Sequence, residues 1–329
     1  MIQKKRILSG MRPTGPLHLG NLHGALANWI KMQDEYDCFF FIADWHALTS
    51  DYENTSSVSD YVKNMMIDWL SAGLSPEKST LFVQSHIKEH AELFLILSMI
   101  TPVPWLERNP TYKDQILQLS NKDLSTFGFL GYPVLQAADI IMYKANGVPV
   151  GIDQVPHVEI TREIARRFNY LYGEVFPEPE AILTETSKIL GTDRRKMSKS
   201  YHNAIYMGDS PKEISATVSQ MITDPQRARK SDPGDPDVCN VFEFHKLYTK
   251  DQDRINQIAQ DCRIAKIGCV ECKKIMGQNL IKFLEPVQEK RAYYESRPEV
   301  VADIIVTGSS KARDVAQQTM EEVRSAMKI

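Results

Sequence analysis

The chain has 329 residues, enough for two domains with sizeable hydrophobic cores. Its 43 % hydrophobic and 25 % charged residues are typical of a globular protein, and its net charge of −3 gives no global signature of nucleic-acid binding, so any polyanion would have to bind local basic patches. No apolar run approaches the ~20 residues of a membrane span, and the first ten residues lack the apolar stretch of a signal peptide. We therefore expect a cytoplasmic protein with no membrane and no DNA partner.

The first half of the chain alternates strand-like and helix-like segments. Short apolar segments rich in β-forming residues predict strands at 6–10, 37–44 and 79–85. Longer segments with helical periodicity lie between them, at 18–36 and 57–73. This alternation is typical of a parallel α/β sheet, which binds ligands at the carboxyl ends of its strands.

From about Lys212 onward the strand signals fade and helical patterns dominate. Interruptions are expected at DPGDPD, residues 232–237, and at TGSSK, residues 307–311. The sequence therefore predicts an α/β domain followed by a helical domain, with a boundary near residues 185–210. The predicted helices of the second half are 212–222, 253–262, 273–284 and 312–327.

The segment ILSGMRPTGPLHLGNLHGAL, residues 7–26, predicts a strand, a glycine-rich turn and a helix. Its spacing fits neither a Walker loop nor a dinucleotide-binding fingerprint. Gly10, Gly15 and Gly20 nevertheless allow the backbone to approach a ligand closely, and a helix beginning near His18 offers N–H groups to phosphate. We expect His18 to donate to a phosphate oxygen. Taken alone, this segment is explained equally well by a tight turn with a surface histidine.

The pentapeptide KMSKS, residues 196–200, follows the polar GTDRR and precedes YHNA, which predicts a loop. Lys196 and Lys199, with hydroxyls between them, suit the stabilisation of charge that develops on a leaving pyrophosphate. A solvated charge run is the ordinary interpretation of two lysines at this spacing. Their combination with the strand–turn–helix at the amino terminus favours the functional interpretation.

HLGN at 18–21 resembles the His-Ile-Gly-His signature of the class I aminoacyl-tRNA synthetases, and KMSKS is identical with their second signature. Asn21 departs from the histidine of most of the class, but the tryptophanyl branch is similar here, with its Gly-Asn pair. The resemblance to that branch extends along nearly the whole chain. It includes SGMRPTG at 9–15, ADWHALT at 43–49, GYPVLQAADIIMY at 131–143, VPVGIDQ at 148–154 and HVEITREIARRFN at 157–169.

The resemblance implies a Rossmann-like catalytic domain over residues 1–190, with the ATP and tryptophan sites and the interface of a homodimer. It implies that residues 191–300 carry the KMSKS loop and a helical anticodon-binding domain, and that 301–329 form a helix that returns to the catalytic domain. The implied reaction activates L-tryptophan with ATP and transfers it to the terminal ribose of tRNA(Trp), releasing pyrophosphate and AMP. Mg²⁺ would accompany the ATP phosphates.

The resemblance also implies the ATP-site residues. His18 would face the phosphates, and Lys196 and Lys199 would follow the pyrophosphate, so these three are the expected catalytic residues. Ile189 would offer its backbone to adenine. The whole expected ATP-binding set is Arg12, Pro13, Thr14, Gly20, Asn21, Gly151, Ile152, Asp153, Ile189, Lys196, Met197, Ser198, Lys199 and Ser200.

Tryptophan recognition follows from the chemistry of indole, which has one donor, its ring N–H, on an apolar body. A pocket that recognises it needs one buried acceptor in an apolar wall. Asp139, within the otherwise small or apolar QAADIIMY, is suited to this, and the resemblance implies that role; a surface aspartate is the weaker interpretation. Such a site can reject phenylalanine by roughly 10⁴–10⁵ without editing. The resemblance adds Gln154 and Tyr132 near the substrate ammonium, and His46, Gln136, Val148 and Val150 in the pocket wall.

Two positions depart from the pattern of better-known bacterial members. Gln136 stands where a methionine commonly packs on the indole, and Leu8 where an aromatic residue is common. The glutamine adds polar atoms that need partners, so the sequence leaves the indole contacts open.

Four of the five cysteines follow the spacing C-x22-C-x6-C-x2-C. A buried cysteine is often only a small hydrophobe, which is our interpretation of Cys38. Four clustered thiols in a reducing compartment instead indicate a metal site, and four thiolates hold either Zn²⁺ or a [4Fe–4S] cluster. A subset of bacterial tryptophanyl enzymes is similar here and has this spacing around a [4Fe–4S] cluster, which favours iron–sulfur and a structural brace for the anticodon domain. The expected ligands are Cys239, Cys262, Cys269 and Cys272.

Three other functions compete at this point. The tyrosyl enzyme is the nearest relative, since a phenol also donates to Asp139. A small nucleotidylyltransferase shares a His-x-Gly-His turn but needs neither KMSKS nor a second helical domain. An iron–sulfur nucleic-acid-binding protein on a synthetase scaffold would not need the intact His18, Lys196, Lys199 and Asp139.

Overall fold

The structure, a computed structural model, describes residues 4–118, 123–184 and 189–329. The chain divides into two compact units. The first comprises Met1–Gly15, Asn28–Thr186 and Arg297–Ile329, and the second comprises Pro16–Ala27 and Ser187–Ser296. The segment 16–27, placed by the sequence in the first domain, thus groups with the second unit. No helix within the described ranges is long and apolar enough to cross a membrane.

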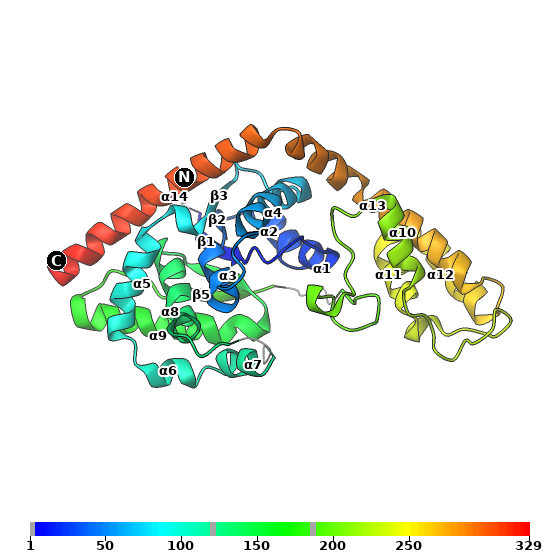
Figure 1. The fold of residues 1–329 in the computed structure, drawn as a ribbon, viewed down its shortest axis with the longest axis horizontal. Coiled ribbons are helices and arrows are strands. Elements are labelled where there is room, and N and C mark those ends of the chain that lie inside the picture. Colours follow the sequence, from blue (N-terminus) through cyan, green and yellow to red (C-terminus); the bar gives the residue numbers. More distant parts are fainter. Residues whose placement is uncertain (1–3, 119–122, 185–188) are drawn as a thin grey trace. The chain divides into compact units, whose positions relative to one another are not determined.

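A five-stranded parallel sheet forms the centre of the first unit (Figure 1). Its strand order is β3-β2-β1-β4-β5. The three predicted strands are confirmed as β1, β2 and β3, and with them the α/β fold class. The sequence did not predict β4 and β5, which are only four residues long and so carry little periodic signal. The strands are β1 (Arg6–Met11), β2 (Asp37–Ile42), β3 (Ser79–Val83), β4 (Gly147–Val150) and β5 (Glu180–Leu183).

One hydrophobic core joins the sheet to helices α5, α8, α9 and α14 of the first unit. The C-terminal helix α14 (Pro298–Met327) contributes Ala312, Ala316, Met320 and Val323, all 0 % exposed. Their spacing of four, four and three positions puts them on one face of the helix. The other helices here are α2 (Ala27–Met32, which begins at the unit boundary), α3 (Asp44–Asp51), α4 (Val58–Ala72), α5 (Glu89–Ile100), α6 (Val103–Glu107), α7 (Pro110–Gln118), α8 (Phe127–Met142) and α9 (Val155–Tyr172).

The predicted interruption at TGSSK is wrong, because α14 runs through it without a break. Gly308 within this segment packs against β3, and a Cβ added there would lie 1.8 Å from the carbonyl oxygen of Leu81. The glycine therefore serves close helix–strand packing and does not end the helix.

The second unit is mostly helical, as predicted. Segment 16–27 joins it through backbone hydrogen bonds, from the Leu19 N–H to the Ile205 oxygen at 3.0 Å and from the Met207 N–H to the Leu17 oxygen at 2.9 Å. Its helices are α1 (Leu19–Asn21), the π-helix η1 (Leu22–Leu26), α10 (Pro211–Ser219), α11 (Asn240–Tyr248), α12 (Gln252–Arg263) and α13 (Cys269–Glu295), with the 3-10 turns η4 (Lys199–Tyr201) and η5 (Pro236–Val238).

Candidate functional site

The apolar helix α8 contains a fully buried carboxylate. Asp139 is 0 % exposed and lies between Ala138 and Ile140, which are also buried. Tyr132, Gln136 and Asp139 are separated by four and three positions, so that they share one face of α8. A buried carboxylate without partners would destabilise the fold by several kcal/mol, so its hydrogen bonds decide what it can do.

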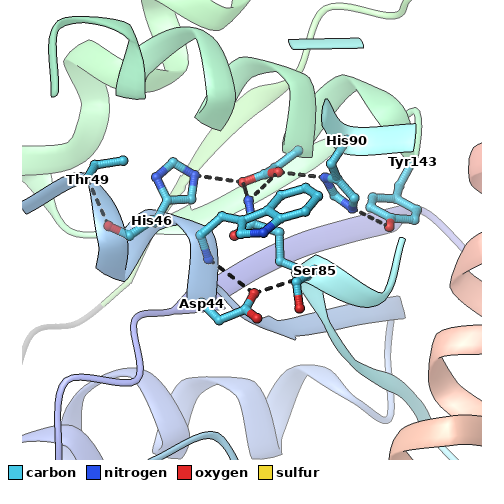
Figure 2. Close-up of polar contacts among 9 residues, drawn as sticks. Asp44, His46, Thr49, Ser85, His90 and Tyr143 are labelled. Atoms are coloured by element: carbon cyan, nitrogen blue, oxygen red, sulfur yellow. Dashed lines mark hydrogen bonds and ion pairs between the residues drawn. The ribbon is translucent and has the colours of Figure 1, made fainter. Parts of the chain in front are cut away.

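Three side chains donate to Asp139 (Figure 2). His46 donates from Nε2 to Oδ2 at 2.8 Å, and His90 donates from Nδ1 to Oδ1 at 2.6 Å. Gln84 donates from Nε2 to both oxygens, at 2.8 and 2.9 Å. These are four contacts, two on each oxygen, and a carboxylate offers about four acceptor positions. A donor on a ligand would therefore share an oxygen of Asp139 with one of these side chains.

The three residues that donate to Asp139 lie shortly after the carboxyl ends of strands β2 and β3. His46 lies in α3, just after β2, whereas Gln84 begins the 3-10 turn η2 (Gln84–His86) directly after β3, and His90 lies in α5. The side chain of Asp44 joins the two strand ends, because its Oδ1 accepts the N–H of Ser85 at 3.0 Å (Figure 2). Ligands of parallel sheets bind at this edge.

The sequence predicted His46 in this site but missed Gln84 and His90. The sequence held one signal for them, because Gln84 and His90 are polar and lie shortly after a buried strand, where ligands of parallel sheets bind. Burial would raise the pKa of Asp139, but the electrostatic attraction of His90 and the hydrogen bonds from His46 and His90 outweigh it and lower that pKa. The carboxylate is therefore ionised and acts as an acceptor at neutral pH.

A second buried hydrogen bond extends this network. Tyr143, 0 % exposed at the end of α8, lies with its hydroxyl 2.7 Å from Nε2 of His90 (Figure 2). Burial raises the pKa of Tyr143 well above its ordinary value, which keeps the hydroxyl protonated. The sequence did not single out Tyr143.

The other residues predicted for tryptophan also lie in the first unit. Val148 and Val150 alternate along β4, so their buried side chains share one face of the sheet. The hydroxyl of Tyr132 lies 3.4 Å from Nε2 of His157, whose pKa burial lowers to about 4. Gln136 and Gln154 are half-buried, and Leu8 is buried in β1.

The HLGN segment of the second unit packs tightly around His18. A Cβ added to Gly20 would lie 3.0 Å from the His18 ring and 3.7 Å from Cβ of Met197. Asn21 accepts the His18 backbone N–H on its Oδ1 at 3.0 Å. Burial, and secondarily the charge of Lys199, lowers the pKa of His18 to about 4, so the imidazole is neutral at pH 7.

One nitrogen of the His18 ring is available to a ligand. Nδ1 of His18 is buried and has no hydrogen-bond partner among the described residues. Such unpaired buried polar atoms are rare, and they are expected where a ligand completes the site. HLGN and KMSKS thus lie close together within one unit, because a Cβ added to Gly20 of HLGN would lie within van der Waals distance of Met197 of KMSKS.

Asn203 holds the KMSKS loop in place from a buried position. Its Oδ1 accepts the N–H of Ser198 at 2.9 Å, and its Nδ2 donates to Asp193 Oδ1 at 2.7 Å and to the Lys196 oxygen at 3.2 Å. The loop prediction is confirmed, with Lys196 and Ser200 exposed and Met197 buried. The loop therefore rests on Met197 and Asn203 and leaves the side chain of Lys196 in solvent.

The predicted ATP-binding residues are distributed over both units. Arg12, Pro13 and Thr14 follow β1, and Gly151, Ile152 and Asp153 follow β4, all in the first unit. Ile152 is 74 % exposed, and Asp153 is also exposed. The second unit carries Gly20, Asn21, Ile189, Lys196, Met197, Ser198, Lys199 and Ser200.

The four clustered cysteines lie in or next to three helices of the second unit. Cys239 precedes α11, Cys262 lies in α12, and Cys269 and Cys272 lie in the first turn of α13. Burial and then the other three thiols raise the pKa of Cys272 to about 12, which means that the thiols lie within electrostatic reach of one another. The part of the chain that the structure describes contains no group of three or more His, Cys, Asp or Glu arranged to hold a metal ion.

Comparison with known proteins gives the family. A family profile described as "tRNA synthetases class I (W and Y)" matches residues 3–285. The chain belongs to the class I tRNA synthetases. This confirms the resemblance drawn from HLGN and KMSKS, and it assigns the buried carboxylate of α8 and the KMSKS loop to a synthetase fold.

Individual class I synthetases match over their full length. The tryptophan–tRNA ligase of Thermotoga maritima is 55 % identical over 325 residues, which covers 98 % of this chain and 99 % of that protein. The tryptophan–tRNA ligase of Aquifex aeolicus is 48 % identical, covering 98 % of this chain and 100 % of that protein. The crystal structure of tryptophanyl-tRNA synthetase from Campylobacter jejuni, complexed with ADP and tryptophan, matches with a TM-score of 0.91 at 34 % identity, over 98 % of this chain and 100 % of that one.

Proposed function

We propose that this chain is a tryptophan–tRNA ligase, which activates L-tryptophan with ATP and Mg²⁺ and transfers it to the terminal ribose of tRNA(Trp). The observation that carries the proposal is the ionised, fully buried carboxylate of Asp139, which three donor side chains hold within an apolar helix. Membership of a family for tryptophan and tyrosine, and relatives of 55 % and 48 % identity named tryptophan–tRNA ligase, support it.

In the first step a carboxylate oxygen of tryptophan attacks the α-phosphorus of ATP, and the bond to the bridging oxygen breaks so that pyrophosphate leaves. Lys196 and Lys199 stabilise the charge that develops on pyrophosphate. Neutral His18 donates an N–H to a phosphate oxygen. In the second step a ribose hydroxyl of tRNA attacks the acyl carbon of the adenylate, and AMP leaves. No covalent enzyme intermediate is needed, so positioning supplies much of the catalysis.

Asp139 accounts for the choice of amino acid. The indole N–H would donate to an oxygen of Asp139 that it shares with a protein donor. Phenylalanine has no such donor, and sites that hydrogen-bond a donor of their substrate strongly reject analogues without it. Tyr132, Gln136, Gln154, His46, Val148 and Val150 form the rest of the proposed tryptophan pocket.

An ATP–pyrophosphate exchange assay across the amino acids tests this function. We expect exchange that depends on tryptophan, and charging of tRNA(Trp) by the same preparation. Exchange with tyrosine only would make the chain a tyrosyl enzyme. Exchange without any amino acid would indicate a nucleotidylyltransferase, and none at all a non-catalytic protein.

We also propose that Cys239, Cys262, Cys269 and Cys272 hold a [4Fe–4S] cluster that braces the helical unit. The donor set fits, because it consists of four thiols, and thiolates are the usual ligands of such clusters. Two polar groups lie next to them: Nη1 of Arg227 lies 3.7 Å from Sγ of Cys262, and Nε2 of His245 lies 3.4 Å from Sγ of Cys272. Burial raises the pKa of Cys262, and the positive charge of Arg227 offsets part of that rise.

Metal analysis of protein purified without oxygen tests the cluster. We expect about four irons and four sulfides per chain and a broad absorption band near 400 nm. Cys→Ser substitution at each of the four positions should abolish the band and leave tryptophan-dependent exchange. About one zinc per chain and no visible absorption would instead indicate a structural zinc site and contradict the cluster.

We further propose a cytoplasmic homodimer joined through the first unit, with the helical second unit as the anticodon-binding part. Large apolar side chains are exposed along the first unit, at Leu95 and Met99 on α5, Val103 on α6 and Phe127 on α8. Exposed apolar side chains on neighbouring elements are typical of subunit interfaces. Sedimentation analysis should give a dimer, and Met99→Lys should shift it toward monomer.

A further inference from the structure

We propose that His90 and Tyr143 are positioning residues that make the enzyme select the indole N–H, acting through Asp139. The inference rests on the proposed function. Both side chains are 0 % exposed, so they act through the carboxylate of Asp139 and do not contact the substrate directly. The hydrogen-bond chain runs from the Tyr143 hydroxyl to His90 Nε2 at 2.7 Å, and from His90 Nδ1 to Asp139 Oδ1 at 2.6 Å (Figure 2).

The His90 ring is held on several sides by aromatic packing. Its centroid lies 5.5 Å from that of Tyr143, 6.3 Å from Phe41 and 6.4 Å from Phe82. These neighbours come from α8, β2 and β3, so the ring is fixed to the sheet and to the helix that carries Asp139. A fixed donor holds the carboxylate plane in one orientation.

The Tyr143 hydroxyl holds the far side of the His90 ring. It lies 2.7 Å from Nε2, so that each ring nitrogen of His90 has a hydrogen-bond partner, Asp139 at Nδ1 and Tyr143 at Nε2. Without the hydroxyl, Nε2 loses a buried hydrogen-bond partner, and the ring can turn away from the carboxylate.

Orientation matters here because the substrate N–H has to share an oxygen of Asp139 with a protein donor. His46, Gln84 and His90 already make four contacts with the two oxygens. When His90 no longer holds Oδ1, Asp139 can turn about its side-chain bond, and the shared oxygen no longer points at the indole N–H. The enzyme should then still bind an indole-shaped ring but should recognise the N–H poorly.

The test compares tryptophan with 3-benzothienyl-alanine, in which sulfur replaces the indole N–H. The measured quantity is the ratio of the two kcat/KM values in ATP–pyrophosphate exchange. A hydrogen bond to a charged acceptor accounts for about tenfold or more in such a ratio. We expect Tyr143→Phe and His90→Leu to lower the ratio at least about tenfold with the KM for ATP unchanged.

Two further variants separate positioning from a general structural role. His90→Asn keeps a donor near the place of Nδ1 and should restore most of the ratio. Tyr172→Phe removes a hydroxyl from a tyrosine that packs on Phe168 in α9, outside the network, and should leave the ratio unchanged.

The outcomes are distinguishable from failure of the proposed function. If both kcat/KM values fall together in Tyr143→Phe and the ratio is unchanged, the positioning role is wrong. If His90→Leu does not fold, Tyr143→Phe decides by itself, because it removes only one oxygen. If the unsubstituted enzyme shows no tryptophan-dependent exchange, the proposed function fails first.

Discussion

Gly308 of α14 and Leu81 of β3 are in backbone contact: a Cβ added to the glycine would lie 1.8 Å from the carbonyl oxygen of Leu81 and 2.8 Å from its carbonyl carbon. The atoms it would meet are backbone atoms of the edge strand β3, so no side-chain rotation can relieve the overlap. This contact fixes the C-terminal helix against the sheet that carries the candidate site.

Gly308→Ala should therefore lower the free energy of unfolding by about 3 kcal/mol or more, since overpacked backbone must move apart. The helix-propensity gain of alanine, about 1 kcal/mol, offsets only part of this. Gly128→Ala is the matched control in α8, because the nearest atom to its added Cβ is Thr126 Oγ1 at 4.0 Å. Urea unfolding measures both, and equal effects would contradict the proposed contact.

Lys196→Ala and Lys199→Ala should each lower kcat for exchange by about 10²–10³, as expected when one group that stabilises developing charge is removed. The KM for tryptophan should change little, because both lysines act on pyrophosphate. Lys212→Ala, which removes an exposed lysine from α10 of the same unit, serves as control. A tryptophan KM effect with normal kcat would assign the lysines another role.

Asp139→Asn should raise the KM for tryptophan at least about 100-fold, in line with the loss of a buried charged acceptor. The amide would also turn a donor toward His46, His90 or Gln84, which are already donors to this position. Steady-state exchange kinetics give both KM values, and the KM for ATP is the internal reference. Equal rises in both would indicate a general collapse of the site.

His157 predicts a pH dependence of stability. It is 1 % exposed, and burial lowers its pKa to about 4, against the ordinary value of 6.5. Between these two values the unfolded chain binds one proton more than the folded chain, so the free energy of unfolding falls as pH falls. Relative to pH 7, the free energy of unfolding should fall by about 3 kcal/mol at pH 4, because each pH unit between the two pKa values contributes about 1.4 kcal/mol.

Urea unfolding at pH 7, 6, 5 and 4.5 measures this slope. The His157→Gln variant cannot take up this proton. The slope of its unfolding free energy against pH should therefore be smaller over the same pH range, by the equivalent of up to one proton bound on unfolding. An unchanged slope would mean that His157 does not contribute to acid sensitivity.

Local sequence patterns were sufficient to predict much of the fold. The apolar segments of β1, β2 and β3 and the helical periodicity between them were enough for a parallel α/β sheet, because strand and helix preferences depend on neighbours in sequence. The prediction failed at β4 and β5, which are too short to show a period, and at TGSSK. There, a glycine that usually signals a chain break instead meets the backbone of Leu81.

The sequence by itself determined the two signatures, the family and the acidic residue of α8, since each is a run of adjacent residues with a specific chemistry. Only the tertiary structure decided the surroundings of Asp139. Gln84 and His90 lie 55 and 49 positions from it in the chain, and His46 lies 93 positions away. No local pattern encodes such distances. These donors meet because parallel strands align their carboxyl ends at one edge of the sheet, and the buried carboxylate of α8 packs against that edge.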